Sequence, residues 1–129
     1  MPFAQEDLSR RHLLTGTEGE EIAVRYLLQE GYQIIRRNYR TSLGEIDIIA
    51  QEGETLVFVE VKTRRGDAFG SPQSAVDLKK QSKITRVALI YIEQKKLTNT
   101  PCRFDVVAVK KYSTRVQIEL IRNAFEMTI

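Results

Sequence analysis

Asp47, Glu60 and Lys62 are charged residues within two runs that are otherwise rich in β-branched and apolar residues. Two carboxylates on adjacent strands, together with the backbone carbonyl of Val61, can bind Mg²⁺ or Mn²⁺ through oxygen and leave positions for water and phosphate. Such an ion activates water and offsets the charge that develops on a phosphate group. This pattern, an aspartate followed after a short gap by Asp/Glu-x-Lys, predicts a hydrolytic metal site.

Lys62 follows Glu60 by two positions, so in an extended strand both side chains project from the same face. A free lysine loses its proton only near pH ~10.4, and neighbouring carboxylates favour its charged form. We therefore assign Lys62 to electrostatic stabilisation and water orientation before general-base catalysis. The alternative without chemistry is a structural ion pair between Lys62 and a carboxylate.

Residues 44–64 form a predicted hairpin, because two β-branched runs flank a Glu-Gly-Glu turn at residues 52–54. A loop of two or four residues places the charged residues of both strands on one face, whereas three or five residues would separate the acids. The opposite face is then wholly apolar and comprises Ile46, Ile48, Ala50, Val57, Val59 and Val61. Carboxylates gathered on one face oppose each other's ionisation, and a divalent cation would remove that penalty.

A helix is predicted from about residue 17 to about residue 30, with Thr17 as its N-cap and Gly31 after its end. Glu20 begins its inward-facing row, and two interpretations of this residue compete. The Thr17-x-x-Glu20 spacing is that of a capping box, in which the glutamate bonds the cap backbone. Alternatively, Glu20 points toward the acidic face of the hairpin and joins the metal ligands.

The remaining elements are a strand at 32–39, a mobile loop at 64–72, a helix from Ser71-Pro72 to about Lys95, and strands at 103–109 and 115–121. The order α-β-β-β-α-β-β predicts an α/β fold with a mixed sheet flanked by helices. We expect residues 1–14 to be a flexible N-terminal arm and residues 15–129 to be a single domain.

The composition limits the available chemistry, because the chain of 129 residues has one cysteine, Cys102, and one histidine, His12. These residues cannot form an intrachain disulfide or the usual one-chain zinc site, so carboxylates and lysines must carry any catalysis. No stretch approaches the ~20 apolar residues of a membrane span, and no signal peptide is evident. We expect a cytoplasmic protein.

Basic residues lie on both sides of the acidic centre in the sequence, and the net charge is +3 with a pI of about 9.1. They either attract a polyanion or form ordinary solvated charges. Lys80 falls within the predicted buried row of the second helix. Its stem could lie along the core with the charged end exposed, or its ammonium could reach a phosphate near the hairpin.

Several motifs together resemble the YraN-like family of bacterial proteins, from about residue 14 to the C-terminus. They are Gly16-x-x-Gly19-Glu20-x-x-Ala23-x-x-Tyr26-Leu27, Gly31-Tyr32, Arg37-Asn38-Tyr39-Arg40, Gly44-Glu45-Ile46-Asp47, Phe58-Val59-Glu60-Val61-Lys62-Thr63-Arg64 and Arg103-Phe104-Asp105-Val106-Val107. The resemblance implies a restriction-endonuclease-like fold, similar to that of archaeal Holliday junction resolvases. It also implies metal-dependent cleavage of DNA, with Glu20, Asp47, Glu60 and Lys62 at the site.

The leading hypothesis is therefore a Mg²⁺- or Mn²⁺-dependent DNA endonuclease acting on branched or recombination intermediates. Asp47, Glu60, the Val61 carbonyl and Glu20 are the expected metal ligands, and Lys62 stabilises the reaction. The expected phosphate contacts are Arg40, Arg64, Arg65 and Lys80. Analogy with resolvases suggests a homodimer, without a membrane partner or a nucleotide cofactor. The alternative is a nucleic-acid-binding or adaptor protein that keeps the fold without cutting.

Overall fold

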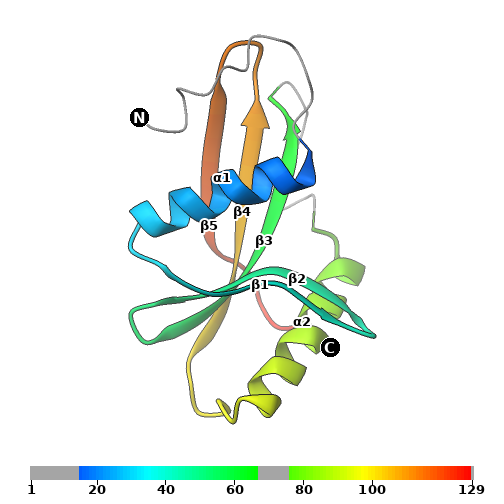
Figure 1. Cartoon of the computed structure of the whole chain (residues 1–129). Coiled ribbons are helices and arrows are strands. Elements are labelled where there is room, and N and C mark those ends of the chain that lie inside the picture. The colour runs from blue at the N-terminus through cyan, green and yellow to red at the C-terminus, as the bar shows by residue number, and fades with distance from the viewer. Residues whose placement is uncertain (1–14, 67–75, 129) are drawn as a thin grey trace.

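The computed structural model describes residues 15–66 and 76–128, and these residues form two helices and a five-stranded sheet. The order is α1 (Gly16–Gln29), β1 (Gln33–Thr41), β2 (Gly44–Glu52), β3 (Thr55–Arg65), α2 (Leu78–Gln94), β4 (Cys102–Lys111) and β5 (Val116–Phe125). Figure 1 shows this arrangement, which confirms the predicted order of elements. The predicted arm at 1–14, and the predicted loop beyond residue 66, lie outside the described residues.

The sheet is mixed, as predicted, and its strands are adjacent in sequence order. β3 and β4 form the parallel pair, whereas the other neighbouring pairs are antiparallel. A parallel pair requires a crossover connection, and α2 lies within the segment that joins β3 to β4. In Figure 1 the β1–β2 hairpin runs across the direction of β3, β4 and β5. The strands of the site therefore separate from one another at one end.

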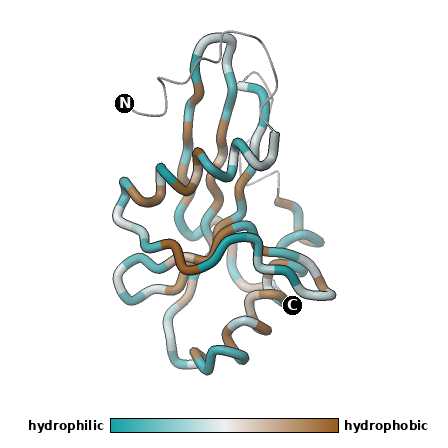
Figure 2. The backbone as a smooth tube through the Cα atoms, viewed as in Figure 1, coloured by the Kyte–Doolittle hydropathy of each residue, from teal (hydrophilic) through white to brown (hydrophobic). Residues whose placement is uncertain are grey.

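Each face of the sheet carries one hydrophobic cluster and one helix. The α1 cluster includes Ile22, Ala23 and Leu27 from the helix and Ile48, Val57, Val59, Val107 and Val109 from the sheet. The α2 cluster includes Ile84, Val87, Ala88, Tyr91 and Ile92 from the helix and Phe58 and Phe104 from the sheet. Figure 2 shows the corresponding apolar segments along the strands and along α1. Apolar burial on both faces is the main favourable term that holds the helices against the strands.

The start of α1 differs from the prediction, because its N-cap is Thr15 and its capping box is formed with Glu18. Glu18 N donates to Thr15 Oγ1 over 3.1 Å, and Thr15 N donates to Glu18 Oε1 over 2.8 Å. The predicted N-cap Thr17 was therefore wrong, and so was the interpretation in which Glu20 closes a capping box with Thr17. Thr-x-x-Glu occurs twice in this segment, and the upstream copy satisfies the first free backbone donors. Glu20 is therefore released from a capping role.

The start of α2 also differs from the prediction, since the helix begins at Leu78; the predicted start, Ser71-Pro72, lies outside the described residues. Its N-cap is Asp77, whose carboxylate accepts a hydrogen bond of 2.8 Å from Lys80 N. Asp is among the strongest N-cap residues, because its carboxylate both accepts this bond and interacts favourably with the helix dipole. The predicted end was correct, since α2 ends at Gln94. Among the described residues, no helix is long and apolar enough to cross a membrane.

A buried polar network connects β4 to β5, to the end of β2 and to Tyr32, which precedes β1. Asp105 is fully buried and accepts hydrogen bonds from Tyr32 Oη at 2.8 Å, Arg103 Nε at 2.8 Å and Asn123 N at 3.0 Å. Arg103 also pairs with Glu52 at the end of β2. Because every member has a partner, the network avoids the large cost of an unpaired buried charge.

Candidate metal and nucleic-acid site

The acidic centre lies where β2 and β3 separate. Their paired residues run from Glu52 opposite Thr55 to Ile48 opposite Val59, so the loop between the strands has two residues. Beyond Ile48 the carboxylate of Asp47 accepts a hydrogen bond of 2.8 Å from Val61 N. The predicted register is therefore confirmed, and it brings Asp47 next to the part of β3 that carries Glu60 and Lys62.

One residue of the hairpin lies on a different face from the one predicted. Ile46 was expected in the apolar row with Ile48, but it belongs to the α2 cluster, whereas Ile48 belongs to the α1 cluster. Strict alternation would place both residues on one face. The two residues lie on either side of Asp47, at the point where the β2–β3 pairing ends. The strand no longer follows the pleat of its neighbour there, and Ile46 faces α2.

Glu60 is a buried carboxylate, 6% exposed, that two lysines approach at the same oxygen. The distance from Glu60 Oε2 is 3.6 Å to Lys62 Nζ and 3.2 Å to Lys80 Nζ. Lys62 comes from β3 and Lys80 from the first turns of α2. The sequence left two orientations open for Lys80, and its ammonium in fact contacts the site. These two cations compensate the buried negative charge of Glu60.

The environment of Asp47 opposes its ionisation. Burial is the main cause and the charge of Glu60 is the next, and together they raise the pKa of Asp47 to about 7. The hydrogen bond from Val61 N acts in the opposite direction, since it favours the carboxylate. Because its charged form is disfavoured without a cation, Asp47 fits an oxygen donor set for a divalent ion. The Val61 carbonyl remains a predicted ligand.

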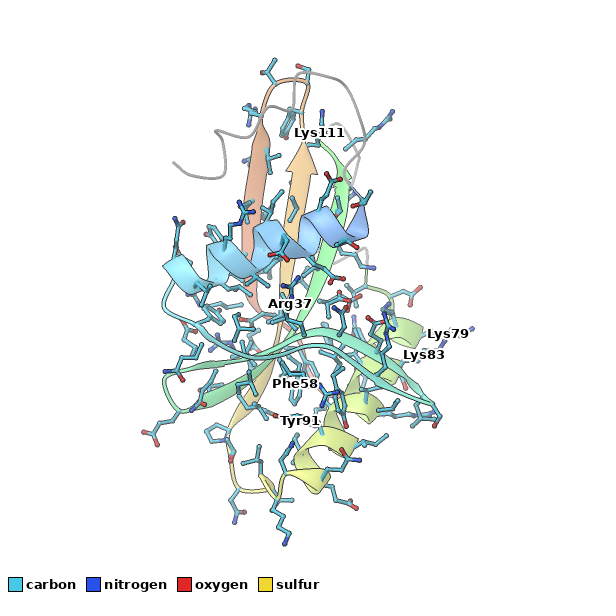
Figure 3. The ribbon with its side chains drawn as sticks, in the orientation of Figure 1. Arg37, Phe58, Lys79, Lys83, Tyr91 and Lys111 are labelled. Atoms are coloured by element: carbon cyan, nitrogen blue, oxygen red, sulfur yellow. The ribbon has the colours of Figure 1, made fainter. Side chains whose placement is uncertain are left out.

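Glu20 lies on α1 near this pair, without joining it as a third ligand. Its pKa is raised, first by burial and then by the charges of Asp47 and Glu45, whereas Arg37 lowers it. Figure 3 labels Arg37, which lies between α1 and the hairpin. Within residues 15–66 and 76–128, no group of three or more His, Cys, Asp or Glu residues could hold a metal ion.

Asn38 and Glu45 belong to this surround, and the sequence analysis gave neither of them a role. With the Asn38 amide oriented to satisfy both carboxylates, its nitrogen donates to Glu45 Oε2 over 3.1 Å and to Glu20 Oε1 over 3.2 Å. Asn38 also has a φ of 53°, in the left-handed region that asparagine tolerates better than most residues. The residue type was a signal, because asparagine tolerates left-handed positions. The sequence alone does not show which asparagine adopts that conformation.

The predicted basic contacts are distributed around the acidic pair. Arg40 is 74% exposed, and its Nε lies 3.5 Å from Glu45 Oε1. Arg64 is partly buried and Arg65 is exposed near the end of β3. Lys79 and Lys83, labelled in Figure 3, project from α2 on the side where the β1–β2 hairpin ends. Positive charge therefore lies in two places beside the acidic centre. One is α2, with Lys79, Lys80 and Lys83, and the other is the end of β3, with Arg64 and Arg65.

A cleft of about 220 Å³ opens between the tip of the β1–β2 hairpin and α2. Asp47 lies on its wall, so the acidic centre is reachable from solvent through this cleft. The other lining residues are Leu43, Gly44, Glu45, Lys80, Lys83 and Ile84. The site thus combines an acidic pair, lysines and an opening, which is the arrangement needed to receive an anionic substrate.

The fold and the site define an α/β protein whose acidic pair and lysines meet where two strands of a mixed sheet separate. The chain belongs to the family described as "Uncharacterised protein family UPF0102", whose model matches residues 19–109. This match confirms the resemblance to the YraN-like family. UPF0102 proteins of Syntrophus aciditrophicus and Geotalea uraniireducens are both 50% identical to it, over 117 and 113 residues. The alignments cover 91% and 87% of this chain and 92% and 89% of those relatives.

A weak structural similarity links the chain to SfsA of Pyrococcus furiosus, solved in complex with Ca²⁺. The TM-score is 0.36 and the sequence identity 16%, with coverage of 83% of this chain and 62% of that chain. This chain therefore spans less than two thirds of SfsA. A score this low carries no argument about the site.

Proposed function

We propose that the protein is a Mg²⁺- or Mn²⁺-dependent DNA endonuclease that hydrolyses phosphodiester bonds, with branched or recombination intermediates as its substrates. The observation that carries this proposal is the pairing of Asp47 with Glu60 at the separation of β2 and β3, with two lysines on one oxygen of Glu60. Here a cleft leads to the group, and burial disfavours the charge of Asp47.

Asp47 and Glu60 supply the anionic oxygen donors for the ion, and the Val61 carbonyl supplies a neutral one. A divalent ion bound there would activate water and offset charge on the phosphate. In this proposal Glu20 contacts the ion through a water molecule, because the described residues contain no group of three His, Cys, Asp or Glu residues that could hold a metal ion. Its position on α1 allows it to hold water against the acidic pair.

Lys62 and Lys80 have one role in the free protein and another with substrate. In the free protein both ammonium groups neutralise Glu60. With a divalent ion bound beside Glu60, both lysines would be available to non-bridging phosphate oxygens, where fixed positive charge stabilises the transition state. Lys62 is placed to orient water, and Lys80 lines the cleft and contacts the phosphate. Arg40, Arg64 and Arg65 contact neighbouring phosphates along the strand.

A cleavage assay with labelled DNA tests the proposal. Supercoiled, flap and four-way substrates are incubated with Mg²⁺ or Mn²⁺ and with wild type, Asp47→Ala, Lys62→Ala or the control Lys95→Ala, which changes a lysine at the far end of α2. We expect cleavage by wild type and Lys95→Ala, and a loss of at least about 100-fold in the two site variants. Cleavage that both site variants retain would reject these roles.

The competing proposal is a nucleic-acid-binding or adaptor protein that does not cut. It differs in its metal requirement, because such a protein needs no ion at the acidic pair. The raised pKa of Asp47 favours the enzyme, because strongly shifted pKa values cluster at functional sites. Dimerisation, proposed by analogy with resolvases, is measured separately by light scattering with and without a four-way substrate.

A further inference from the structure

The tip of the β1–β2 hairpin carries a side chain that the reaction itself does not use. β1 ends at Thr41 and β2 begins at Gly44, so Ser42 and Leu43 form the turn. Leu43 is 47% exposed and also lines the cleft that contains Asp47. Two-residue hairpin turns favour Asn, Asp and Gly, so turn formation does not explain a leucine at this position.

The tip is held in place by its own side chains. Leu43 N donates to Thr41 Oγ1 over 3.1 Å, and Thr41 Oγ1 donates to the carbonyl of Gly44 over 3.3 Å. Gly44 has a φ of 152°, which a residue with a side chain rarely adopts. Leu43 is thus presented by a fixed turn beside the opening, which lowers the entropy lost when it contacts a ligand.

The opposite wall of the cleft is basic. Lys80 and Lys83 line it from α2, and Lys79 is exposed one turn away from Lys83 on the same helix. Figure 3 shows Lys79 and Lys83 projecting on the side of the hairpin tip. An apolar group facing lysines matches a nucleic-acid strand, in which flat apolar bases alternate with charged phosphates.

The volume of the cleft limits what can enter it. At about 220 Å³ it is smaller than the roughly 300–1,000 Å³ typical of small-molecule pockets, which favours a narrow ligand such as one DNA strand. Asp47 lies inside this cleft. A strand that has left its duplex can bring a phosphodiester bond to this carboxylate.

We propose that the cleft between the β1–β2 hairpin and α2 takes an unpaired DNA strand, and that Leu43 packs on the base exposed where this strand leaves a duplex. Apolar side chains such as leucine act in this way in proteins that unstack base steps. This inference rests on the proposed function and names its substrate class, which is DNA with a junction between single and double strands. Lys80 and Lys83 hold the phosphates of the unpaired strand.

The test compares binding to three labelled DNAs of related sequence: a splayed fork, a blunt duplex and a single strand. Fluorescence anisotropy is measured in Ca²⁺, so that affinity is determined separately from cleavage in Mg²⁺. Leu43→Ala is compared with Leu28→Ala, which removes the same atoms from a leucine that is 53% exposed on α1. Leu43→Met keeps an apolar group of similar volume and serves as the conservative variant.

We expect wild type to bind the fork at least tenfold more tightly than the duplex. Leu43→Ala should weaken fork binding about fivefold to tenfold, because it removes the apolar contact with the exposed base, and should leave the salt dependence unchanged. Leu28→Ala should match wild type, and Leu43→Met should restore most of the preference. Lys83→Ala should weaken binding to all three DNAs and lower the salt slope by about one.

Equal affinity for fork and duplex, or equal effects of Leu43→Ala and Leu28→Ala, would overturn the inference even if cleavage is observed. Conversely, a fork preference that depends on Leu43, with no cleavage of any DNA in Mg²⁺ or Mn²⁺, supports the binding mode and rejects the proposed hydrolysis. The two failures are therefore distinguishable.

Discussion

Neutralising Asp47 should make the metal-free protein more stable at alkaline pH. The pKa of Asp47 is raised from 3.8 to about 7, mainly by burial and then by the charge of Glu60. A carboxyl group whose pKa is raised in the folded state contributes its full stabilisation when the pH is below its unfolded-state pKa. That stabilisation is lost as the pH rises through its folded-state pKa. Asp47→Asn removes the charge at every pH, while its amide oxygen can still accept the hydrogen bond from Val61 N.

The magnitude follows from the size of this shift. About three pKa units at ~1.36 kcal/mol each give an upper limit of ~4 kcal/mol at pH 8. Partial exposure to solvent and the lysines on Glu60 reduce the penalty, so we expect Asp47→Asn to be more stable than wild type by about 2 kcal/mol at pH 8. The difference should be nearly absent at pH 4. Mg²⁺ should stabilise wild type at pH 8 and leave the variant almost unchanged.

Urea unfolding in EDTA at pH 4, 6 and 8, followed by circular dichroism, measures these differences. The control is Glu54→Gln, which neutralises an exposed acid in the β2–β3 turn and should change stability by less than about 0.5 kcal/mol. A variant that is less stable than wild type at pH 8 would refute the reasoning. A difference that stays constant across the three pH values would refute it equally, because the effect would then not arise from ionisation.

Three further predictions concern the framework that positions the site. Thr15→Ala should cost about 1 kcal/mol in urea unfolding and Thr17→Ala much less, because Thr15 is the N-cap; equal effects would contradict this assignment. Gly19→Ala should cost about 1–3 kcal/mol, since a Cβ there would clash with Thr63 Oγ1. Thr63→Ala should recover part of that cost in the double variant, and simple additivity would argue against the contact. Asp105→Ala should cost about 3–5 kcal/mol, visible as a much lower Tm, because Tyr32 Oη, Arg103 Nε and Asn123 N lose the buried acceptor that they share.

The register of the β2–β3 hairpin was predictable, because period-two alternation and a short turn determine it almost completely. Ile48, Val57 and Val59 lie on the apolar face as the pattern indicates, and Asp47 lies next to β3. The alternation failed at Ile46, because pairing between the strands ends there and the pattern assumes continuous pairing.

The helix starts were less predictable, because several residues near each start could serve as the N-cap. Two copies of Thr-x-x-Glu overlap before α1, and only the upstream copy fits where the chain turns into the helix. In the second case Ser71-Pro72 resembled a helix start more strongly than Asp77, which is the actual cap. Short-range patterns show that a cap is available without showing which one the packing of the helix requires.

The composition of the site was predicted better than its spatial relations. Asp47, Glu60, Lys62 and Lys80 do come together, but the approach of both lysines to a single oxygen of Glu60 depends on how α2 packs against the sheet. The contact of Asn38 with two carboxylates depends on its backbone conformation. Both features arise from tertiary packing, which local sequence patterns do not encode.

The most direct test of the central claim is calorimetric titration of Mn²⁺ at pH 7.5 into wild type, Asp47→Asn and Glu60→Gln, with Glu54→Gln as the control. We expect one binding site in wild type and in the control. Its affinity should fall at least tenfold in each of the two site variants, while circular dichroism shows that they stay folded. Unchanged Mn²⁺ binding in Asp47→Asn and Glu60→Gln, or no binding to wild type, would contradict the assignment of a metal site to this acidic pair.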